Sequence, residues 1–369
     1  MNNGTVIFTV AGDAGGANAL LPVIARLRAA GAALFPAGYA TVPDLWRAKD
    51  ETVLELPAET SIAQAGEMLR AHGAGLLLTG TSVNGVDLER RFVLAARAAG
   101  IPTLALLDFW SNYAPRFSSA PGRLDCLPDA IAVMDELAMK EMTAEGFPAH
   151  ILHVTGQPLF DNLAELRAGL TPNRRKALRA SVGVREGERL VAFACQPLND
   201  VYREHGARAV LGYDEWDALP AVIDTLEALR AELPLRLLLL PHPREPKGKY
   251  DAAAARSWIA FAPSFTSSRE VALVADLMVG MNSMLLMESV LLGTPALSVQ
   301  PNLRARDALP MSRNGVIPRV ERLKELPGVL RGLFGTPAGQ ALAAQHVSAA
   351  GRVAELALRL LNQGAVSGA

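Results

Sequence analysis

Two short turns in the second half of the chain carry residue types suited to binding a phosphate group. In the first turn, His242 and Pro243 precede Arg244, and they follow an apolar run. Proline fixes the backbone and removes competing N–H donors, so this histidine is held beside a cation. In the second turn, Asn282 or Ser283 stands where a helix N-cap belongs. Free backbone N–H groups and the positive end of the helix dipole would therefore meet an anion there.

The second turn belongs to a stretch that predicts a strand, a turn, a helix and a strand. The predicted elements are the strands Leu277–Val279 and Pro295–Val299 and the helix Met284–Leu292. Gly293 ends the helix, and Glu288 near its middle is placed to accept a hydrogen bond from a sugar hydroxyl. The alternative is an ordinary βαβ unit in which Ser283 only caps the helix.

A glycine-rich turn follows the first predicted strand and contains Gly12, Asp13, Gly15 and Gly16. Its glycines allow a ligand to approach the backbone closely. Their spacing is not the fingerprint of dinucleotide-binding proteins. Asp13 is the first candidate for a general base, and the alternative is that it only caps the following helix.

An aromatic turn follows a later strand of the same half. Only 5% of the residues are aromatic, yet four of them lie between Phe109 and Phe117, beside Asp108. Asp108 is the second candidate base. Aromatic faces with polar neighbours are suited to holding sugar rings, and the alternative is a packed loop. The residues predicted to bind an acceptor are Trp110, Asn112, Tyr113 and Arg116.

Short apolar strands alternate with helices along the whole chain, which predicts parallel sheets covered by helices on both faces. The remaining predicted strands are Thr5–Val10, Ala33–Pro36, Thr52–Leu56, Leu76–Thr79, Thr103–Leu107, Ala130–Val133, Ile151–Val154, Arg189–Cys195, Leu235–Leu240 and Trp258–Ala262. The predicted helices include Ala19–Ala30 and Pro220–Glu232. The polar segment Asn199–Asp214 is interpreted as a flexible cover or a contact between copies of the chain. The turns described above follow strands, so they are expected at the edge where open α/β sheets bind ligands.

The length of 369 residues predicts two domains and a final helical segment. We place the first domain at residues 1–165 and the second at 166–336. Residues 337–369 are expected to be helical and to cross back onto the first domain.

Composition excludes several classes of protein. The net charge is −1, with 36 basic and 37 acidic residues, so no basic field favours nucleic acid. The two cysteines have no metal-ligand spacing and form no disulfide framework, which favours the cytoplasm.

We recognise no signal peptide, and the apolar runs are too short to span a membrane, so any membrane contact would be peripheral.

Three motifs in this order resemble GT-B enzymes, the two-domain glycosyltransferases and the related sugar-nucleotide epimerases. They are His242-Pro243, the Asn282-Ser283 turn with Glu288, Gly293 and Pro295 after it, and the crossover Thr155–Asp161. The resemblance implies an α/β GT-B fold of two Rossmann-like, doubly wound parallel-sheet domains with an interdomain cleft. It also implies a nucleotide-sugar in the second domain, an acceptor on the first, and no metal or other cofactor.

The His-Pro motif is similar to that of bacterial sialyltransferases and polysialyltransferases. This resemblance slightly favours a CMP-linked nonulosonic acid or a Kdo-type sugar as donor, with UDP-sugars next. The chain departs from those enzymes in the second turn, where Asn282-Ser283 stands in place of their Ser-Ser or Ser-Thr pair. The implied nucleotide-sugar-binding residues are Gly12, Gly15, Gly16, Gln196, His242, Pro243, Arg244, Asn282, Ser283 and Glu288.

The sequence thus predicts transfer of a sugar to a glycan, lipid-linked or protein acceptor. His242 and Ser283 would hold the phosphate oxygens, and Asp13 or Asp108 would deprotonate the acceptor. A sugar-nucleotide epimerase is an alternative, although we recognise none of its carboxylate-rich motifs. A non-catalytic binding subunit is another, which the complete first half disfavours.

Overall fold

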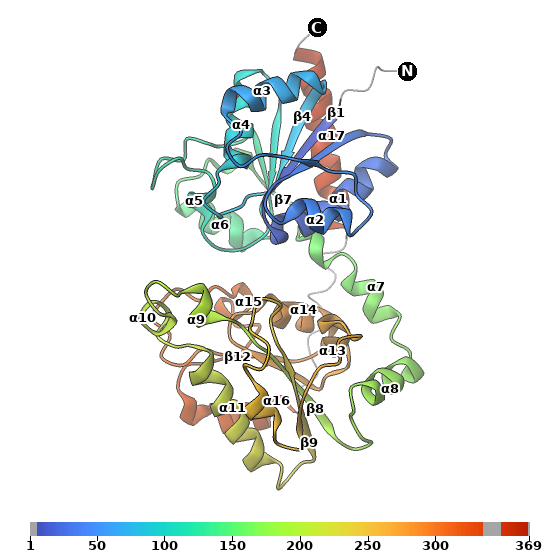
Figure 1. Cartoon of the computed structure of the whole chain (residues 1–369), viewed down its shortest axis with the longest axis vertical. Coiled ribbons are helices and arrows are strands. Elements are labelled where there is room, and N and C mark those ends of the chain that lie inside the picture. The colour runs from blue at the N-terminus through green and yellow to red at the C-terminus, as the bar shows by residue number, and fades with distance from the viewer. Residues whose placement is uncertain (1–5, 335–347, 368–369) are drawn as a thin grey trace. The chain divides into compact units, whose positions relative to one another are not determined.

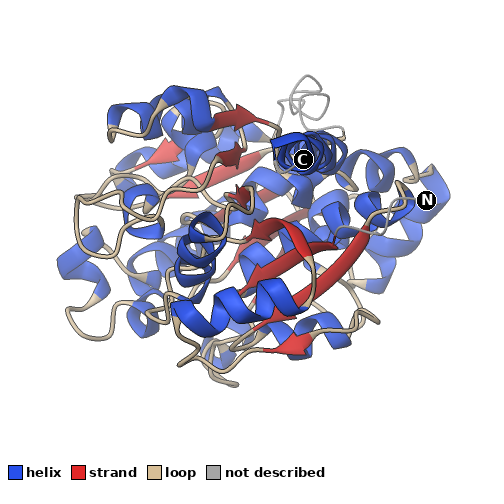
Figure 2. Ribbon diagram, turned by 90° about the horizontal axis from the view of Figure 1, so that it is seen from above, coloured by secondary structure: helices blue, strands red, loops and turns tan. Residues whose placement is uncertain are grey.

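The computed structural model describes residues 6–334 and 348–367. Its contacts divide the chain into two compact units. Unit 1 contains the described residues through Asp161 together with the C-terminal helix, and unit 2 begins at Asn162. Each unit is a parallel sheet flanked by helices, as Figures 1 and 2 show.

Unit 1 contains a seven-stranded parallel sheet in the order β3-β2-β1-β4-β5-β6-β7. Its strands are β1 Val6–Ala11, β2 Ala33–Gly38, β3 Leu54–Glu55, β4 Ala74–Thr79, β5 Thr103–Leu106, β6 Ala130–Val133 and β7 Leu152–Val154. Its helices are α1 Ala14–Ala29, α2 Val42–Arg47, α3 Ile62–Ala71, α4 Leu88–Ala98, α5 Tyr113–Arg116, α6 Glu136–Ala144, η1 Ala149–Ile151, η2 Pro158–Phe160 and α17 Ala349–Ser367. Successive residues of β1, Ile7 and Phe8, belong to different core clusters, so both faces of the sheet are covered.

Unit 2 contains a six-stranded parallel sheet in the order β10-β9-β8-β11-β12-β13. Its strands are β8 Arg189–Ala194, β9 Leu235–Leu240, β10 Ile259–Phe261, β11 Leu277–Gly280, β12 Ala296–Val299 and β13 Arg319–Val320. Its helices are α7 Leu163–Ala168, α8 Pro172–Ser181, α9 Leu198–Val201, α10 Ala207–Leu211, α11 Glu215–Leu229, α12 Asp251–Ala254, α13 Ser268–Val274, α14 Met284–Leu292, α15 Pro310–Arg313, η3 Leu323–Glu325 and α16 Leu326–Leu333. The predicted fold class, two doubly wound parallel-sheet units, is confirmed.

Both sheets have the same topological switch point. In unit 1 the strand order reverses between β1 and β4, and in unit 2 between β8 and β11. At such a point, the connections leave the two neighbouring strands toward opposite faces of the sheet, and ligands of open α/β sheets bind in the crevice there. The turns after these four strands therefore lie where a ligand of such a sheet is expected.

Two helices begin earlier than the sequence pattern predicts, each by five residues. Helix α1 begins at Ala14 because Asp13 caps it, and α11 begins at Glu215 because Asp214 forms a capping box with Asp217. The segment predicted to be irregular, Asn199–Asp214, contains the short helices α9 and α10. Part of the predicted final helical segment, residues 335–347, lies outside the described residues.

Helix α17 returns to unit 1, and Figure 1 shows it in red beside the blue α1. Val353 and Ala357 of α17 share a buried core with α1. Asp161 accepts hydrogen bonds from the backbone N–H groups of Ala349 (2.9 Å) and Ala350 (2.8 Å). Asp161, the last residue of unit 1 before the chain enters unit 2, thus caps the first turn of α17. No helix among the described residues is both long and apolar enough to cross a membrane.

We expect Asp161→Ala to destabilise unit 1, because two N–H groups of α17 lose their acceptor. The loss should be about 1 kcal/mol, which corresponds to a fall in Tm of about 2–4 °C. Asp161→Asn keeps one acceptor oxygen and should lose less. Differential scanning calorimetry measures both, and equal losses in the two variants would contradict the capping role.

Candidate functional site

The switch point of unit 2 joins the two turns that follow β8 and β11. Gln196 follows β8, and its Nε2 donates to Oδ1 of Asn282 (2.7 Å). The backbone N–H of Asn282 donates back to Oε1 of Gln196 (3.0 Å). This reciprocal pair fixes the turn that leads into α14. Both residues were predicted to bind the nucleotide-sugar, and the structure gives them a positioning contact with each other.

The turn after β11 presents the N-terminus of α14. Ser283 is the N-cap, and its Oγ accepts from the N–H of Leu285 (3.3 Å). Gly293 closes the helix with a φ of 93°, a left-handed conformation that glycine adopts without strain. The predicted βαβ unit and both helix boundaries are confirmed. The remaining N–H groups of this first turn and the dipole of the helix favour an anion.

Glu288 lies farther along α14 and is not free to act alone. Its two oxygens are held by Arg269, with Nη2 at 2.6 Å and Nε at 3.1 Å. Sequence reasoning missed this pair because Arg269 comes from the preceding helix, α13. A sugar hydroxyl would have to share the carboxylate with that guanidinium, so the predicted role of Glu288 stays a prediction.

The turn after β9 holds His242 by its backbone and by one ring nitrogen. Its N–H donates to Oε2 of Glu245 (2.7 Å), and its Nδ1 accepts from the N–H of Arg244 (3.2 Å). Burial and the nearby charge of Arg244 lower the pKa of His242. The imidazole is therefore neutral at pH 7, with its proton on Nε2. It can donate one hydrogen bond to a phosphate oxygen but brings no positive charge.

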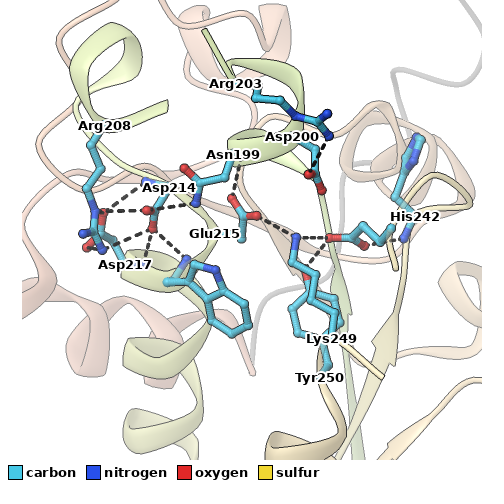
Figure 3. A network of polar contacts seen from close by, with 12 residues as sticks. Asn199, Asp200, Arg203, Arg208, Asp214, Glu215, Asp217, His242, Lys249 and Tyr250 are labelled. Carbon is cyan, nitrogen blue, oxygen red and sulfur yellow. Dashed lines mark hydrogen bonds and ion pairs between the residues drawn. The ribbon is translucent and has the colours of Figure 1, made fainter. Parts of the chain in front are cut away.

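A buried network of hydrogen bonds and ion pairs anchors this turn, as Figure 3 shows. Lys249 donates to Glu215 (2.6 Å) and to Glu245 (3.1 Å), and both glutamate side chains are 1% exposed. Burial lowers the pKa of Lys249, but its hydrogen bonds to the two carboxylates raise it more. Tyr250 also donates to Glu245. Because Glu245 holds the N–H of His242, the network links that histidine to α11.

The same loop borders a small cavity. A space of about 300 Å³ lies between α9 and the loop after β9, and Arg203 and Arg244 line it together with Asp200. Arg244 and Pro243 are exposed. The segment Asn199–Asp214, predicted to be a flexible cover or a contact between copies, thus supplies one wall of a polar cavity.

The switch point of unit 1 carries carboxylates instead of phosphate-binding groups. Asp13 follows β1, is half-buried, and accepts from the N–H of Gly16 (2.8 Å). It therefore caps α1, the alternative considered from the sequence. Capping occupies its Oδ1, and the second oxygen remains able to accept a proton. The base role of Asp13 stays a prediction.

Asp108 follows β5 and lies against the start of α1. A Cβ on Gly15 would lie 2.2 Å from Oδ2 of Asp108, so only glycine leaves room for this carboxylate. Arg116 pairs with Asp108 (2.9 Å) and also donates to Thr81. Burial raises the pKa of Asp108; the charge of Arg116 opposes this shift, and Asp13 adds to it.

Glu89 is a third carboxylate at this edge, and it was not among the predicted site residues. It is 5% exposed and receives hydrogen bonds from the hydroxyls of Tyr39 and Ser82. Burial raises its pKa, and these hydrogen bonds only partly oppose the shift. The negative charge of Asp13 raises it further, which places the two groups in one electrostatic cluster. The sequence signal was the small polar turn after β4, directly before the helix that carries Glu89.

The glycines after β1 serve close packing and do not form an open loop. Gly15 and Gly16 lie in the first turn of α1. A Cβ on Gly12 would lie 1.9 Å from Cζ of Tyr39, so the tyrosine ring occupies that space. The space beside Gly15 is filled by Asp108, as described above. The predicted role of Gly12, Gly15 and Gly16 in nucleotide-sugar binding stays a prediction, since these packing contacts do not test it.

The aromatic turn after β5 is packed inward. Trp110 and Tyr113 are at most 1% exposed, and they donate to Asp135 (2.8 Å) and Glu141 (2.6 Å). Arg116 is also buried, where it binds the turns after β4 and β5 together. The packed-loop alternative holds for these three residues because their polar atoms find partners inside unit 1. Asn112 alone of the predicted acceptor residues is exposed.

Within the described residues, no three histidine, cysteine, aspartate or glutamate side chains are grouped so that they could hold a metal ion. Cys126 and Cys195 are both buried and unpaired with each other.

No family model and no curated protein matches the chain. Solved structures do match its fold. The UDP-GlcNAc 2-epimerase from Neisseria meningitidis, bound to UDP-GlcNAc, has a TM-score of 0.69 at 14% identity and covers 96% of this chain and 100% of its own. The UDP-GlcNAc 2-epimerase from Methanocaldococcus jannaschii has a TM-score of 0.68 at 12% identity, with 97% and 100% covered. The glycotransferase of kitacinnamycin has a TM-score of 0.61 at 17% identity, with 97% and 100% covered. The chain therefore has the GT-B-like fold that these epimerases and this glycosyltransferase share.

Proposed function

We propose that the chain is an enzyme that acts on a nucleotide-sugar, and that its reaction is an acid–base epimerisation of the sugar. The observation that carries this proposal is the group of carboxylates at the switch point of unit 1, two of them with raised pKa values. The full-length likeness to two structures named UDP-GlcNAc 2-epimerase supports it. UDP is accordingly the preferred nucleotide. The CMP-sugar donor rested on the His-Pro motif alone, and these likenesses do not support it.

Unit 2 supplies the groups for the nucleotide phosphates. The first turn of α14 offers backbone N–H groups, and Ser283 adds a hydroxyl. Neutral His242 offers its Nε2 proton, and exposed Arg244 offers a cation beside it. These donors suit a diphosphate, which accepts several hydrogen bonds at once.

Unit 1 supplies the groups for proton transfer. An epimerisation removes a proton from one face of a carbon and returns one to the other face, so it needs a base and an acid. Carboxyl groups whose environments differ can divide these roles. Buried Glu89, whose pKa is raised by burial, is the candidate acid. Half-buried Asp13 is the candidate base, and Asp108 lies beside it.

Glycosyl transfer is the second candidate. One observation favours it, the likeness to the glycotransferase of kitacinnamycin along 97% of the chain. A transferase needs a single base to deprotonate the acceptor, for which Asp13 alone would suffice. A raised pKa at Glu89 would then have no chemical use, which is why we place transfer second.

Incubation with nucleotide-sugars in D2O, without an acceptor, tests the reaction. We expect UDP-sugars to yield an epimer with solvent deuterium at the inverted carbon, measured by NMR and mass spectrometry. CMP-, GDP- and TDP-sugars serve as controls. Slow hydrolysis without deuterium would favour transfer instead, and binding without turnover would leave only a binding subunit.

The variants His242→Ala and Ser283→Ala should weaken UDP binding, because each removes a donor to a charged phosphate. We expect the Kd to rise about ten-fold or more in each variant. Calorimetry measures this, and His150→Ala, an exposed histidine of unit 1, is the matched control. Because His242 binds as a neutral donor, affinity should stay flat between about pH 6.5 and 8. A fall in affinity as pH rises would instead assign the contact to an imidazolium.

The variants Glu89→Gln and Asp13→Asn should lower kcat by about 100-fold or more while UDP affinity is kept. In the native enzyme, kcat/KM should fall on the alkaline side, because Glu89 loses its proton as pH rises through its raised pKa. That fall should be absent from the residual activity of Glu89→Gln. Full activity in either variant would remove that residue from the proton-transfer pair.

A further inference from the structure

The opposite, amino-terminal edge of the unit 2 sheet borders a cavity of about 420 Å³. Arg189 begins β8, and Asp276 directly precedes β11, so both come from this edge. Arg167 from α7 and Arg175 from α8 line the same cavity. It lies away from the turns that carry His242 and Ser283, which follow the carboxyl ends of β9 and β11.

Two arginines of the cavity wall, Arg175 and Arg189, face Asp276, and that aspartate is already engaged. Asp276 accepts from Arg179 (3.0 Å) and from the N–H of Leu190 (2.7 Å). The nearest nitrogens of Arg175 and Arg189 lie at 3.6 and 3.7 Å, beyond hydrogen-bond distance. The donors of these two guanidinium groups are therefore available to another anion.

The third arginine of the cavity wall, Arg167, packs closely against Gly293. A Cβ on Gly293 would lie 3.0 Å from Cζ of Arg167, and the glycine has a φ of 93°. Among the described residues, no carboxylate pairs with the Arg167 side chain, which is half-buried. A further arginine, Arg179, lies close to Arg175 although it does not line the cavity: burial and its charge lower the pKa of Arg175, and Asp276 opposes them.

The rest of the cavity wall combines Thr294 with several apolar side chains. Leu170, Leu273, Leu292 and Phe334 line it together with the arginines. A space of this volume falls within the range of small-molecule sites, and it is larger than a single phosphate ion requires. Planar guanidinium groups bind phosphate in a bidentate manner, while leucine and phenylalanine side chains suit an apolar body.

We propose that this arginine cavity is a second binding site, for a small organic phosphate whose apolar part packs on the leucine and phenylalanine side chains. Its occupant would relieve the repulsion among the arginines and join α7 and α8 to the sheet edge. The site is independent of the nucleotide site, so either proposal can fail without the other.

Phenyl phosphate tests the site, because it carries the phosphate and an apolar ring but no nucleoside. We expect it to raise the Tm of the full chain and to bind more tightly than inorganic phosphate in calorimetry. Both effects should persist in His242→Ala/Ser283→Ala. In Arg175→Ala/Arg189→Ala the Kd should rise about ten-fold or more, and Arg175→Lys/Arg189→Lys should restore it only in part.

Arg256→Ala is the matched control, since this exposed arginine belongs to unit 2 and does not line the cavity. It should bind phenyl phosphate as the native chain does. Three results would overturn the proposal: no binding by the native chain at millimolar concentration, unchanged binding in the double alanine variant, or loss of binding in His242→Ala/Ser283→Ala alone. The circular dichroism spectrum of each variant separates lost binding from lost folding.

Discussion

The order of parallel strands in the two sheets determines where the turns that carry Asp13 and Ser283 lie. Each sheet reverses its strand order once, between β1 and β4 and between β8 and β11. A parallel strand cannot turn back directly, so each connection leaves the sheet over one face or the other. At the reversal, the connections from the two neighbouring strands go to opposite faces of the sheet. They leave a crevice between the turns, in which a ligand can bind. Polar groups such as Asp13 and Ser283 can then stand at the sheet edge without disturbing the core.

The two switch points differ in their chemistry. In unit 2 the turn is held by neutral groups, the amides of Gln196 and Asn282, and it presents backbone N–H donors. In unit 1 the turns enclose carboxyl groups, and burial raises the pKa of Glu89 and of Asp108. An anion is favoured at the first edge and disfavoured at the second. Carboxyl groups whose pKa is raised by burial are the kind of group that proton transfer uses, and they lie at the second edge.

Sequence patterns located the strands and α14 well because these elements are bounded by apolar runs, caps and glycines that act locally. The strand β9 and the helix α14 were predicted to the residue. What sequence patterns could not show depends on contacts that are distant in sequence. Trp110 was predicted to bind an acceptor, but it is buried, and its N–H donates to Asp135. Asp135 lies on another element, so the local sequence does not reveal this partner. The pair of Glu288 with Arg269 and the enclosure of Glu89 by Tyr39 are equally invisible to local patterns.

The neutral state of His242 has a wider consequence for how unit 2 treats anions. The Nδ1 of His242 accepts a backbone N–H, and burial and Arg244 disfavour the charged form of the ring. Such a histidine offers an anion one hydrogen bond in a fixed direction and no positive charge. The N-terminus of α14, after β11, also favours a fixed direction, since its N–H groups are fixed in space. The amino-terminal edge of the sheet carries guanidinium groups, whose positive charge attracts an anion from any direction. The carboxyl edge therefore suits a ligand that must be held in one pose for chemistry, and the amino edge suits one that need only be bound.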